Sequence, residues 1–243
     1  MGQAVRNISP LKSDTTPPYE IIIPAAGVGK RMIYCGAHPL LNITSKMTIL
    51  QHQLKIIKEC LPCDPTIILV TGFQAQKVMD YVPQTLITIE NEKYEETNIT
   101  RSIGMGLRAT RTNHVLIIYG DLIFNKYALS SLLIRNNEST IIIDNNYMIQ
   151  KEKEVGCIVH KNLIQNLWYD LPKKWAQIVL LTGRELELAK KICWNRQYYN
   201  LFGFEMLNII INRGGKFKAL QPYKIKSIDI DSVNDILLAR KII

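Results

Sequence analysis

Short aliphatic and β-branched runs alternate along the chain with segments in which apolar residues recur at helical spacing. Runs that are apolar throughout are typical of strands buried on both faces of a sheet. Strands are therefore predicted at residues 20–23, 66–70, 86–90, 115–119 and 140–143. Helices are predicted at residues 49–59, 75–81, 98–110 and 126–135, with Asn125 placed to cap the last one. This alternation predicts an α/β fold, with a mixed, mainly parallel sheet and helices on both faces.

The pattern is less regular from about residue 145 to residue 213. A strand at 155–160 and an amphipathic helix at 183–194 are predicted there, followed by a last core strand at 226–230 and a helix at 233–242. The first 18 residues are polar and contain Pro, Ser and Thr, without the apolar stretch of a signal peptide. We therefore expect a flexible arm at 1–18 and a single domain at 19–243, with an acceptor-side insertion at about 145–225.

Composition and charge exclude several classes of function. The chain has a formal charge of +9, but its Lys and Arg residues are scattered, so nucleic acid is not expected as a partner. No apolar run approaches the ~20 residues that cross a bilayer, so no membrane is expected either. The five cysteines are odd in number, and Cys60 and Cys63 form the only closely spaced pair. Reduced thiols in a cytoplasmic protein are the expectation.

A glycine-rich segment, Pro24-Ala25-Ala26-Gly27-Val28-Gly29-Lys30-Arg31-Met32, directly follows the first predicted strand. Small residues let the backbone approach a ligand closely, and successive N–H groups can surround a phosphate. A Walker loop would need Gly at Pro24 and a hydroxyl residue at Arg31. A dinucleotide-binding Rossmann fingerprint would need a third Gly at Met32. The segment therefore predicts a phosphate-binding loop of another kind.

This segment resembles the Ala-Ala-Gly-x-Gly-x-Arg-Met signature of the NTP-dependent nucleotidyltransferases. That family includes the sugar-phosphate nucleotidyltransferases, the phosphocholine cytidylyltransferases and MobA-like NTP transferases. Further similarity follows in the same order along the chain, at residues 40–59, 66–72, 91–102, 120–121 and 229–235. The pattern Asn91-x-x-Tyr94-x-x-Thr97-Asn98-x-x-x-Ser102 is similar to the phosphocholine cytidylyltransferase branch. The resemblance implies a Rossmann-like fold of the nucleotide-diphospho-sugar transferase type.

The resemblance also implies roles for individual residues. Loop amides and the Lys30 and Arg31 side chains would hold the phosphates, and polar groups after the third strand would hold the nucleotide. Asp121 and Asp231 would bind Mg²⁺, which prefers one or two carboxylates plus phosphate oxygens and water. Asp235, one helical turn further on, is expected to be a capping acid. The implied nucleotide-binding residues are Ala25, Ala26, Gly27, Gly29, Thr97, Asn98 and Ser102.

The sequence departs from the family pattern at two positions that bear on the chemistry. His38 stands where a phosphate-neutralising lysine is usual, and it would be only partly charged near its reference pKa of ~6.5. Lys46 lies nearby but matches a different position. Asp229 replaces a glutamate. Trp175 lies where an acceptor-contacting segment is expected, although a core or lid tryptophan is the commoner arrangement.

The function implied is transfer of an NMP group from a nucleoside triphosphate to a small phosphorylated acceptor, with release of pyrophosphate. CTP or UTP is favoured as donor, with CMP the preferred group, and a sugar phosphate or phosphocholine as acceptor. One alternative is a catalytically impaired nucleotide-binding protein or scaffold on the same fold, because His38 replaces the lysine. A second, less favoured alternative is a nucleic-acid-associated protein that uses the +9 charge. The sequence leaves a homo-oligomer open.

Overall fold

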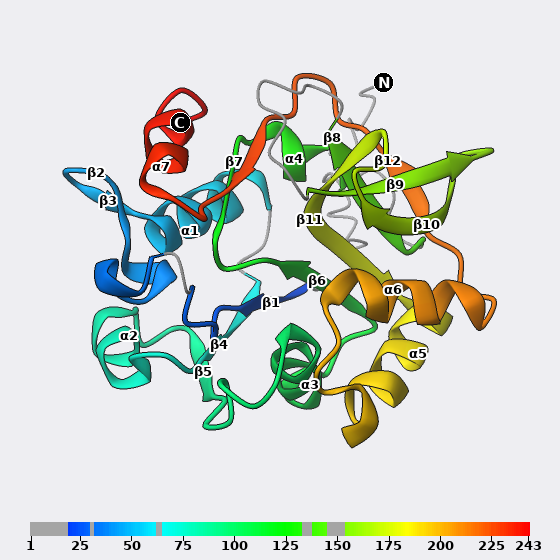
Figure 1. Cartoon of the computed structure of the whole chain (residues 1–243), viewed down its shortest axis with the longest axis horizontal. Helices are drawn as coiled ribbons and strands as arrows, with labels where there is room; N and C mark the ends of the chain where they lie inside the picture. Colours follow the sequence, from blue (N-terminus) through cyan, green and yellow to red (C-terminus); the bar gives the residue numbers. More distant parts are fainter. Residues whose placement is uncertain (1–18, 30–31, 62–64, 133–137, 145–153) are drawn as a thin grey trace, which may run out of the picture.

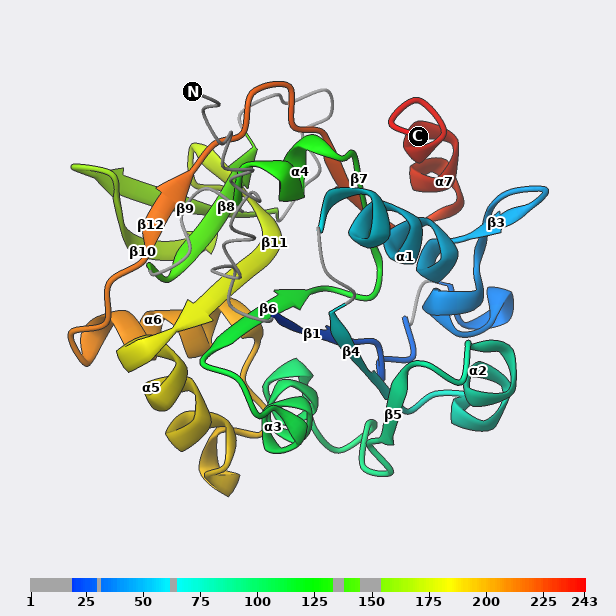
Figure 2. The same cartoon turned by 180° about the vertical axis from the view of Figure 1, so that it is seen from behind.

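The computed structural model describes residues 19–29, 32–61, 65–132, 138–144 and 154–243. At its centre is a nine-stranded sheet of order β5-β4-β1-β6-β11-β8-β12-β10-β9 (Figures 1 and 2). Its strands are β1 (Glu20–Pro24), β4 (Thr66–Thr71), β5 (Ile87–Glu90), β6 (His114–Ile118), β8 (Thr140–Asp144), β9 (Val155–His160), β10 (Leu163–Tyr169), β11 (Lys173–Thr182) and β12 (Lys218–Leu220). Two small two-stranded sheets lie outside it, β2 (Asn42–Thr44) with β3 (Met47–Thr48), and β7 (Leu122–Phe124) with β13 (Ser227–Asp229).

The first four strands in space, β5, β4, β1 and β6, are parallel. We call them the parallel half. Ile22 of β1 lies opposite Ile68 of β4 and Ile117 of β6, and all three side chains are buried. Consecutive strands are joined by helical crossovers, as parallel pairing requires. The carboxyl ends of these strands therefore meet at one edge, where the loops between strand and helix lie.

The other five strands form the mixed half. β11 is antiparallel to β6 and to β8, β12 is parallel to β8, and β10 is antiparallel to β12 and β9. The described part of residues 145–225 supplies β9 to β12 and two helices, and β11 lies at the centre of the sheet. This segment therefore completes the core.

Helices cover both faces of the sheet, as predicted. On one face α3 (Ile99–Ala109), α5 (Gly183–Cys193) and α6 (Gly203–Asn212) bury their apolar sides in one core cluster (Figure 1). On the other, α1 (Ile49–Cys60), α2 (Ala75–Tyr81) and the short α4 (Tyr127–Ser130) pack into a second cluster. A third, smaller cluster joins α7 (Val233–Ala239) to β2, β7 and β13. No helix in the described part of the chain is long and apolar enough to cross a membrane.

Four local predictions need correction. The predicted strand at 86–90 is the edge strand β5, and no residue of β5 is fully buried. The predicted last core strand is β13, which pairs only with β7 outside the main sheet. The helix predicted at 126–135 ends at Ser130, and residues 133–135 lie outside the described residues. Asn125 does not cap α4, because its side chain bonds instead to the backbone of Lys224 and Lys226.

The cysteines in the described part of the chain form no disulfide. Cys35, Cys60, Cys157 and Cys193 are free thiols, and Cys63 lies outside the described residues. Burial raises the pKa of the Cys157 thiol to about 12. Thiols held protonated in this way are poor nucleophiles and poor metal ligands.

Candidate functional site

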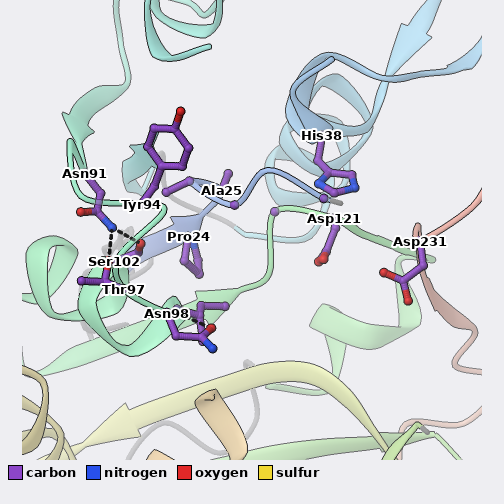
Figure 3. A pocket seen from close by; sticks show the side chains of 15 residues that line it. Pro24, Ala25, His38, Asn91, Tyr94, Thr97, Asn98, Ser102, Asp121 and Asp231 are labelled. Atoms are coloured by element: carbon purple, nitrogen blue, oxygen red, sulfur yellow. Dashed lines mark hydrogen bonds between the residues drawn. The ribbon is translucent and has the colours of Figure 1, made fainter. Parts of the chain in front are cut away.

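A pocket of about 230 Å³ opens at the carboxyl ends of β1 and β6 and is bounded on one side by the start of α3 (Figure 3). The described residues predicted for the site all line this pocket: Ala25, Ala26, Gly27, Gly29, His38, Thr97, Asn98, Ser102, Asp121 and Asp231. They come from five separate segments of the chain, which only the fold brings together. Lys30 and Arg31 lie outside the described residues.

The glycine loop leaves β1 along a path fixed by backbone hydrogen bonds. The N–H of Ala25 donates to the carbonyl of Val70 at 2.8 Å, and that of Phe73 donates to the carbonyl of Ala26 at 3.0 Å. A Cβ added at Gly27 would meet no atom within 4 Å, so this position faces open space. Gly29 has a φ of +58°, which favours glycine. The loop thus presents exposed backbone beside the pocket, as a phosphate-binding loop requires.

Gly120 allows the end of β6 to lie directly against the start of this loop. A Cβ at this position would be 2.5 Å from the Cβ of Ala25 and 3.0 Å from the carbonyl of Pro24. The N–H of Gly120 donates to that same carbonyl at 3.2 Å. A side chain here would separate the two strand ends, so the glycine sets the position of Asp121 relative to the loop.

Asn91 organises the polar side of the pocket. Its Nδ2 donates to Oγ1 of Thr97 and to Oγ of Ser102, both at 3.2 Å (Figure 3). Asn98 caps α3, accepting from the N–H of Ile99 at 2.7 Å. Some of the polar atoms that were expected to bind a ligand therefore hydrogen-bond within the protein instead and hold these side chains in place. The result is a rigid polar wall.

Asp121 and Asp231 approach each other through a backbone contact. Asp229 pairs with Leu122 in the β7–β13 sheet, and the N–H of Ile230 donates to the carbonyl of Asp121 at 3.0 Å. Both carboxylates line the pocket, as Figure 3 shows. The Asp235 carboxylate accepts from the N–H of Asp231 at 3.0 Å and forms a capping box with Ser232 at the start of α7. The expected capping role of Asp235 is confirmed.

The chemistry of this pair suits a hard divalent cation. The described residues contain no group of three or more His, Cys, Asp or Glu side chains placed to hold a metal, so the site is not an all-protein cage. Mg²⁺ instead commonly uses one or two carboxylates and completes its shell with phosphate oxygens and water. Two carboxylates beside a glycine loop fit that preference.

His38 lies on the 3₁₀ helix η2 (His38–Leu40) and packs against Gly29 so closely that a Cβ at Gly29 would overlap the imidazole. The buried Nε2 of the imidazole has no hydrogen-bond partner among the described residues. Burial lowers the pKa of His38, against the opposing effect of the Ile230 backbone. A neutral imidazole therefore occupies the position beside the phosphate loop.

The pocket also contains residues that were not singled out as site residues. Asn91 and Tyr94 belong to the pattern that carried the family resemblance, so a signal for them was present. Pro24 and Gly120 flank predicted site residues, and Ile99 carried no signal in the sequence. Pocket-lining apolar residues of this kind are indistinguishable in sequence from core residues.

Trp175 is not among the residues that line this pocket. Its side chain is buried, and its ring packs edge-on against Tyr119 at a centroid distance of 5.3 Å. The neighbouring Lys174 is paired with Glu154 at 2.7 Å and with Asp229 at 3.7 Å. Burial would lower the pKa of Lys174, but the two carboxylates outweigh it and raise the pKa. This lysine therefore stays charged and ties β11 to β13, two residues from Asp231.

A family model of the MobA-like NTP transferase domain matches residues 21–179. Among solved structures, the chain is similar to the inositol-1-phosphate CTP transferase from T. maritima, with 17% identity and a TM-score of 0.76 over 93% of this chain and 96% of that one. It is similar to the CTP:phosphocholine cytidylyltransferase from Streptococcus pneumoniae, with 16% identity and a TM-score of 0.75 over 93% and 99% of the two chains.

A third similar structure is a putative glucose-1-phosphate thymidylyltransferase from Bacillus anthracis, with 14% identity and a TM-score of 0.72 over 92% of this chain and 94% of that one. At these identities the likeness establishes the fold, which is the mixed α/β fold of the nucleotide-diphospho-sugar transferases. No curated protein matches the sequence significantly.

Proposed function

We propose that this chain, which belongs to the MobA-like NTP transferase family, transfers an NMP group from a nucleoside triphosphate to a small phosphorylated acceptor and releases pyrophosphate. One observation carries the proposal: the glycine loop, the polar wall and two carboxylates, far apart in sequence, line a single pocket. Family membership supports the reaction class. The pocket supports the assignment of the residues.

In the proposed reaction an oxygen of the acceptor phosphate attacks the α-phosphorus in line. A new P–O bond forms as the bond from the α-phosphorus to the bridging oxygen breaks, and the electron pair leaves with pyrophosphate. Such chemistry requires positioning and charge neutralisation more than a protein nucleophile. The loop amides at Gly27 and Gly29 would hold the phosphates, and Lys30 and Arg31 would neutralise the leaving pyrophosphate.

Asp121 and Asp231 would hold Mg²⁺, which when bound neutralises phosphate charge in this type of reaction. The chain's own contribution is to fix both carboxylates. Gly120 brings the end of β6 against the loop, and the bond from Ile230 to the Asp121 carbonyl sets the second strand beside the first. Preorganised charges cost little reorganisation during the reaction.

CTP is the proposed donor. The sequence pattern from Asn91 to Ser102 is similar to that of phosphocholine cytidylyltransferases, and these residues form the polar wall of the pocket. The wall carries the hydroxyl groups of Thr97 and Ser102 and the side-chain amide of Asn98 at the start of α3, which suit the base or ribose. Phosphocholine and sugar phosphates are the proposed acceptors, approaching from the side of residues 145–225.

The experiment is a matrix of CTP, UTP, ATP and GTP against phosphocholine and several sugar phosphates, with pyrophosphate release as the readout. We expect one nucleotide to dominate, with Mg²⁺ required and turnover strongly reduced in Asp121→Asn. A thermal-shift titration with each nucleotide runs alongside. A ligand at 100 times its Kd stabilises by ~2.7 kcal/mol, which is a shift of roughly 5–10 °C for a domain of this size. Absence of any nucleotide-dependent shift would contradict the proposal.

One observation favours a second candidate, a nucleotide-binding protein with little or no turnover. His38 is buried, its pKa is lowered by burial, and its Nε2 has no hydrogen-bond partner among the described residues. A neutral imidazole cannot neutralise phosphate charge as a lysine does. The variant His38→Lys distinguishes the active enzyme from the nucleotide-binding protein with little turnover. A gain in pyrophosphate release with unchanged CTP affinity supports impaired catalysis, whereas a loss supports an active enzyme adapted to histidine.

A further inference from the structure

A second pocket, of about 530 Å³, lies beside α3 and shares only Thr97 with the lining of the proposed nucleotide pocket. We call it the arginine pocket. The outer surface of α3 forms one side of this pocket, and the segment that follows α5 forms the other side. It is lined by Lys93, Arg101, Arg108, Trp194, Arg196 and Tyr199, among others. None of these residues takes part in the proposed reaction.

The charges around this pocket are unbalanced. Four basic side chains line it, and the single carboxylate, that of Glu96, lies 3.4 Å from the Nζ of Lys93. The three arginines of the pocket form no ion pair with a described residue: no carboxylate of the described residues lies within 4.0 Å of Arg101, Arg108 or Arg196. Concentrated positive charge of this kind is available to an anionic ligand.

Aromatic rings hold two of the guanidinium groups in place. The Cζ of Arg101 lies 4.5 Å from the centre of the Tyr199 ring, and its Nη1 donates to the Tyr199 hydroxyl at 3.0 Å. The Cζ of Arg108 lies 5.9 Å from the Trp194 ring. Trp194 is itself fixed, since its Nε1 donates to the carbonyl of Gly104 at 3.2 Å.

Arg101 and Arg108 are seven residues apart on α3, which is two helical turns, so they project from the same side of the helix. Their guanidinium faces rest on aromatic rings, which leaves N–H donors at the edges for a ligand. Because the side chains are already ordered, binding loses less conformational entropy. Guanidinium groups pair with phosphate through two parallel hydrogen bonds, a geometry that a lysine cannot provide.

We propose that the arginine pocket binds a small phosphorylated molecule through Arg101, Arg108 and Arg196, separately from the nucleotide pocket. The charge, the fixed guanidinium groups and the size of the cavity all point to a ligand bearing more than one negative charge. The aromatic faces are occupied by guanidinium groups, so recognition rests on the phosphate.

The pocket is also connected to the proposed nucleotide site. Thr97 lines both pockets, and the N–H of Asn98, the N-cap of α3, donates to the carbonyl of Tyr199 at 2.8 Å. A ligand that fixes Tyr199 therefore stabilises the start of the helix that borders the nucleotide pocket. Occupancy of one pocket is expected to change affinity at the other, and this part rests on the proposed function.

The test uses inorganic pyrophosphate as the probe and the indole N–H signal of Trp194 in NMR spectra as the local readout, at physiological salt. Trp194 lines the arginine pocket and not the nucleotide pocket, so its signal reports binding there even if the proposed reaction is wrong. We expect a saturable shift in the wild type. In R101Q/R108Q the apparent Kd should rise at least tenfold.

The matched control is K77Q/K191Q, which removes the same number of positive charges from exposed positions on α2 and α5. It should bind pyrophosphate as the wild type does. Equal weakening in both double variants would show general charge attraction and overturn the proposal. Should R101Q/R108Q fail to fold, the exposed Arg196→Gln replaces it, with an expected rise of several-fold. Tighter binding of a single-stranded oligonucleotide than of pyrophosphate would overturn the assignment to a small molecule.

Coupling is measured as the Kd for CTP at a fixed pyrophosphate concentration. Competition at the nucleotide pocket affects the wild type and R101Q/R108Q equally, so a difference between them reports the arginine pocket. If pyrophosphate changes the Kd for CTP equally in the two proteins, the proposed coupling is wrong, while the binding of pyrophosphate in the arginine pocket is unaffected by this result. Failure of CTP to bind either protein would count against the proposed function instead.

Discussion

The parallel and mixed halves of the sheet differ in how they build a surface for ligands. In the parallel half, β1 and β6 end at the same edge, and most residues that line the proposed nucleotide pocket lie at the ends of β1, β5 and β6, in the loops that follow them, or at the start of α3. In the mixed half, strands run in both directions, and β11 carries a buried pair, Lys174 and Trp175, near its start. Parallel strands place chemistry in loops at one edge, whereas antiparallel strands place it along their faces.

This difference suggests that the two halves of the sheet have different functions. We infer that the parallel half holds the nucleotide and Asp121, that Asp231 is added from the end of β13 outside the main sheet, and that the mixed half shapes the approach of the acceptor. Tyr119 connects the two, because it precedes Gly120 and Asp121 and its ring packs on Trp175. Substitutions in each half should therefore change different kinetic quantities.

The largest effect is expected for Asp121→Asn in the parallel half. The amide keeps the size of the side chain but removes the negative charge, so turnover should fall about 10²–10³-fold, the scale seen when one preorganised electrostatic contact is lost. The measurement is Mg²⁺-dependent pyrophosphate release. Asp80→Asn, on α2 outside the pocket, is the control and should keep full activity. Equal losses in both variants would contradict the assignment.

Gly29→Ala should weaken CTP binding about tenfold. The residue has a φ of +58°, and a methyl group there would overlap the His38 imidazole. A residue other than glycine in the left-handed backbone conformation costs ~1–2 kcal/mol of conformational free energy. Displacement of the His38 side chain adds to this cost. Calorimetric Kd values for Gly29→Ala, His38→Ala and the double variant form a double-mutant cycle. We expect the loss from Gly29→Ala to shrink when His38 is already alanine. Strict additivity would show that the contact is unimportant.

Trp175→Phe tests the mixed half. The smaller ring cannot fill the space of the indole against Tyr119, which directly precedes Gly120 and Asp121, so the packing between β11 and the segment after β6 should loosen. The KM for the acceptor is expected to rise several-fold, while the Kd for CTP stays within twofold. A weaker CTP affinity with an unchanged acceptor KM would reverse the proposed division between the halves.

The smallest effect concerns stability in acid. Burial lowers the pKa of His52, which lies on α1, and of His38. In the unfolded chain these histidines bind a proton near pH ~6.5. In the folded chain they bind it only at a lower pH, because burial disfavours the charged imidazole. The free energy of unfolding should therefore be constant above that pH and fall as the pH drops below it.

Urea unfolding at pH 7.5 and 5.5 measures this decline. It should be smaller in His52→Gln than in the wild type. His160→Gln, at an exposed position on β9 in the mixed half, is the control and should leave the decline unchanged. An unchanged decline in His52→Gln would mean that other groups cause the acid sensitivity.

The parallel half was largely predictable from sequence because its strands are short apolar runs separated by amphipathic helices. β1, β4 and α2 match their predicted ranges to within one residue. In the mixed half, β8, β9 and α5 were predicted, but β10, β11, β12 and α6 were not. β10 alternates polar and apolar residues irregularly, and its pairing with β9 contains a register shift. Antiparallel pairing that depends on distant partners leaves a weak local signal.

The sequence by itself determined the family, the α/β fold and most residues of the nucleotide pocket, because the glycine loop and the Gly-Asp pair are local motifs that follow buried strands. Tertiary structure alone decided how these residues meet. It placed β13 beside β7, so that Asp231 lies near Asp121, and it packed His38 against Gly29. It also formed the arginine pocket, whose side chains come from α3 and from a segment almost 90 residues further along the chain. Contacts between distant segments depend on the packing of the whole core, which no local pattern encodes.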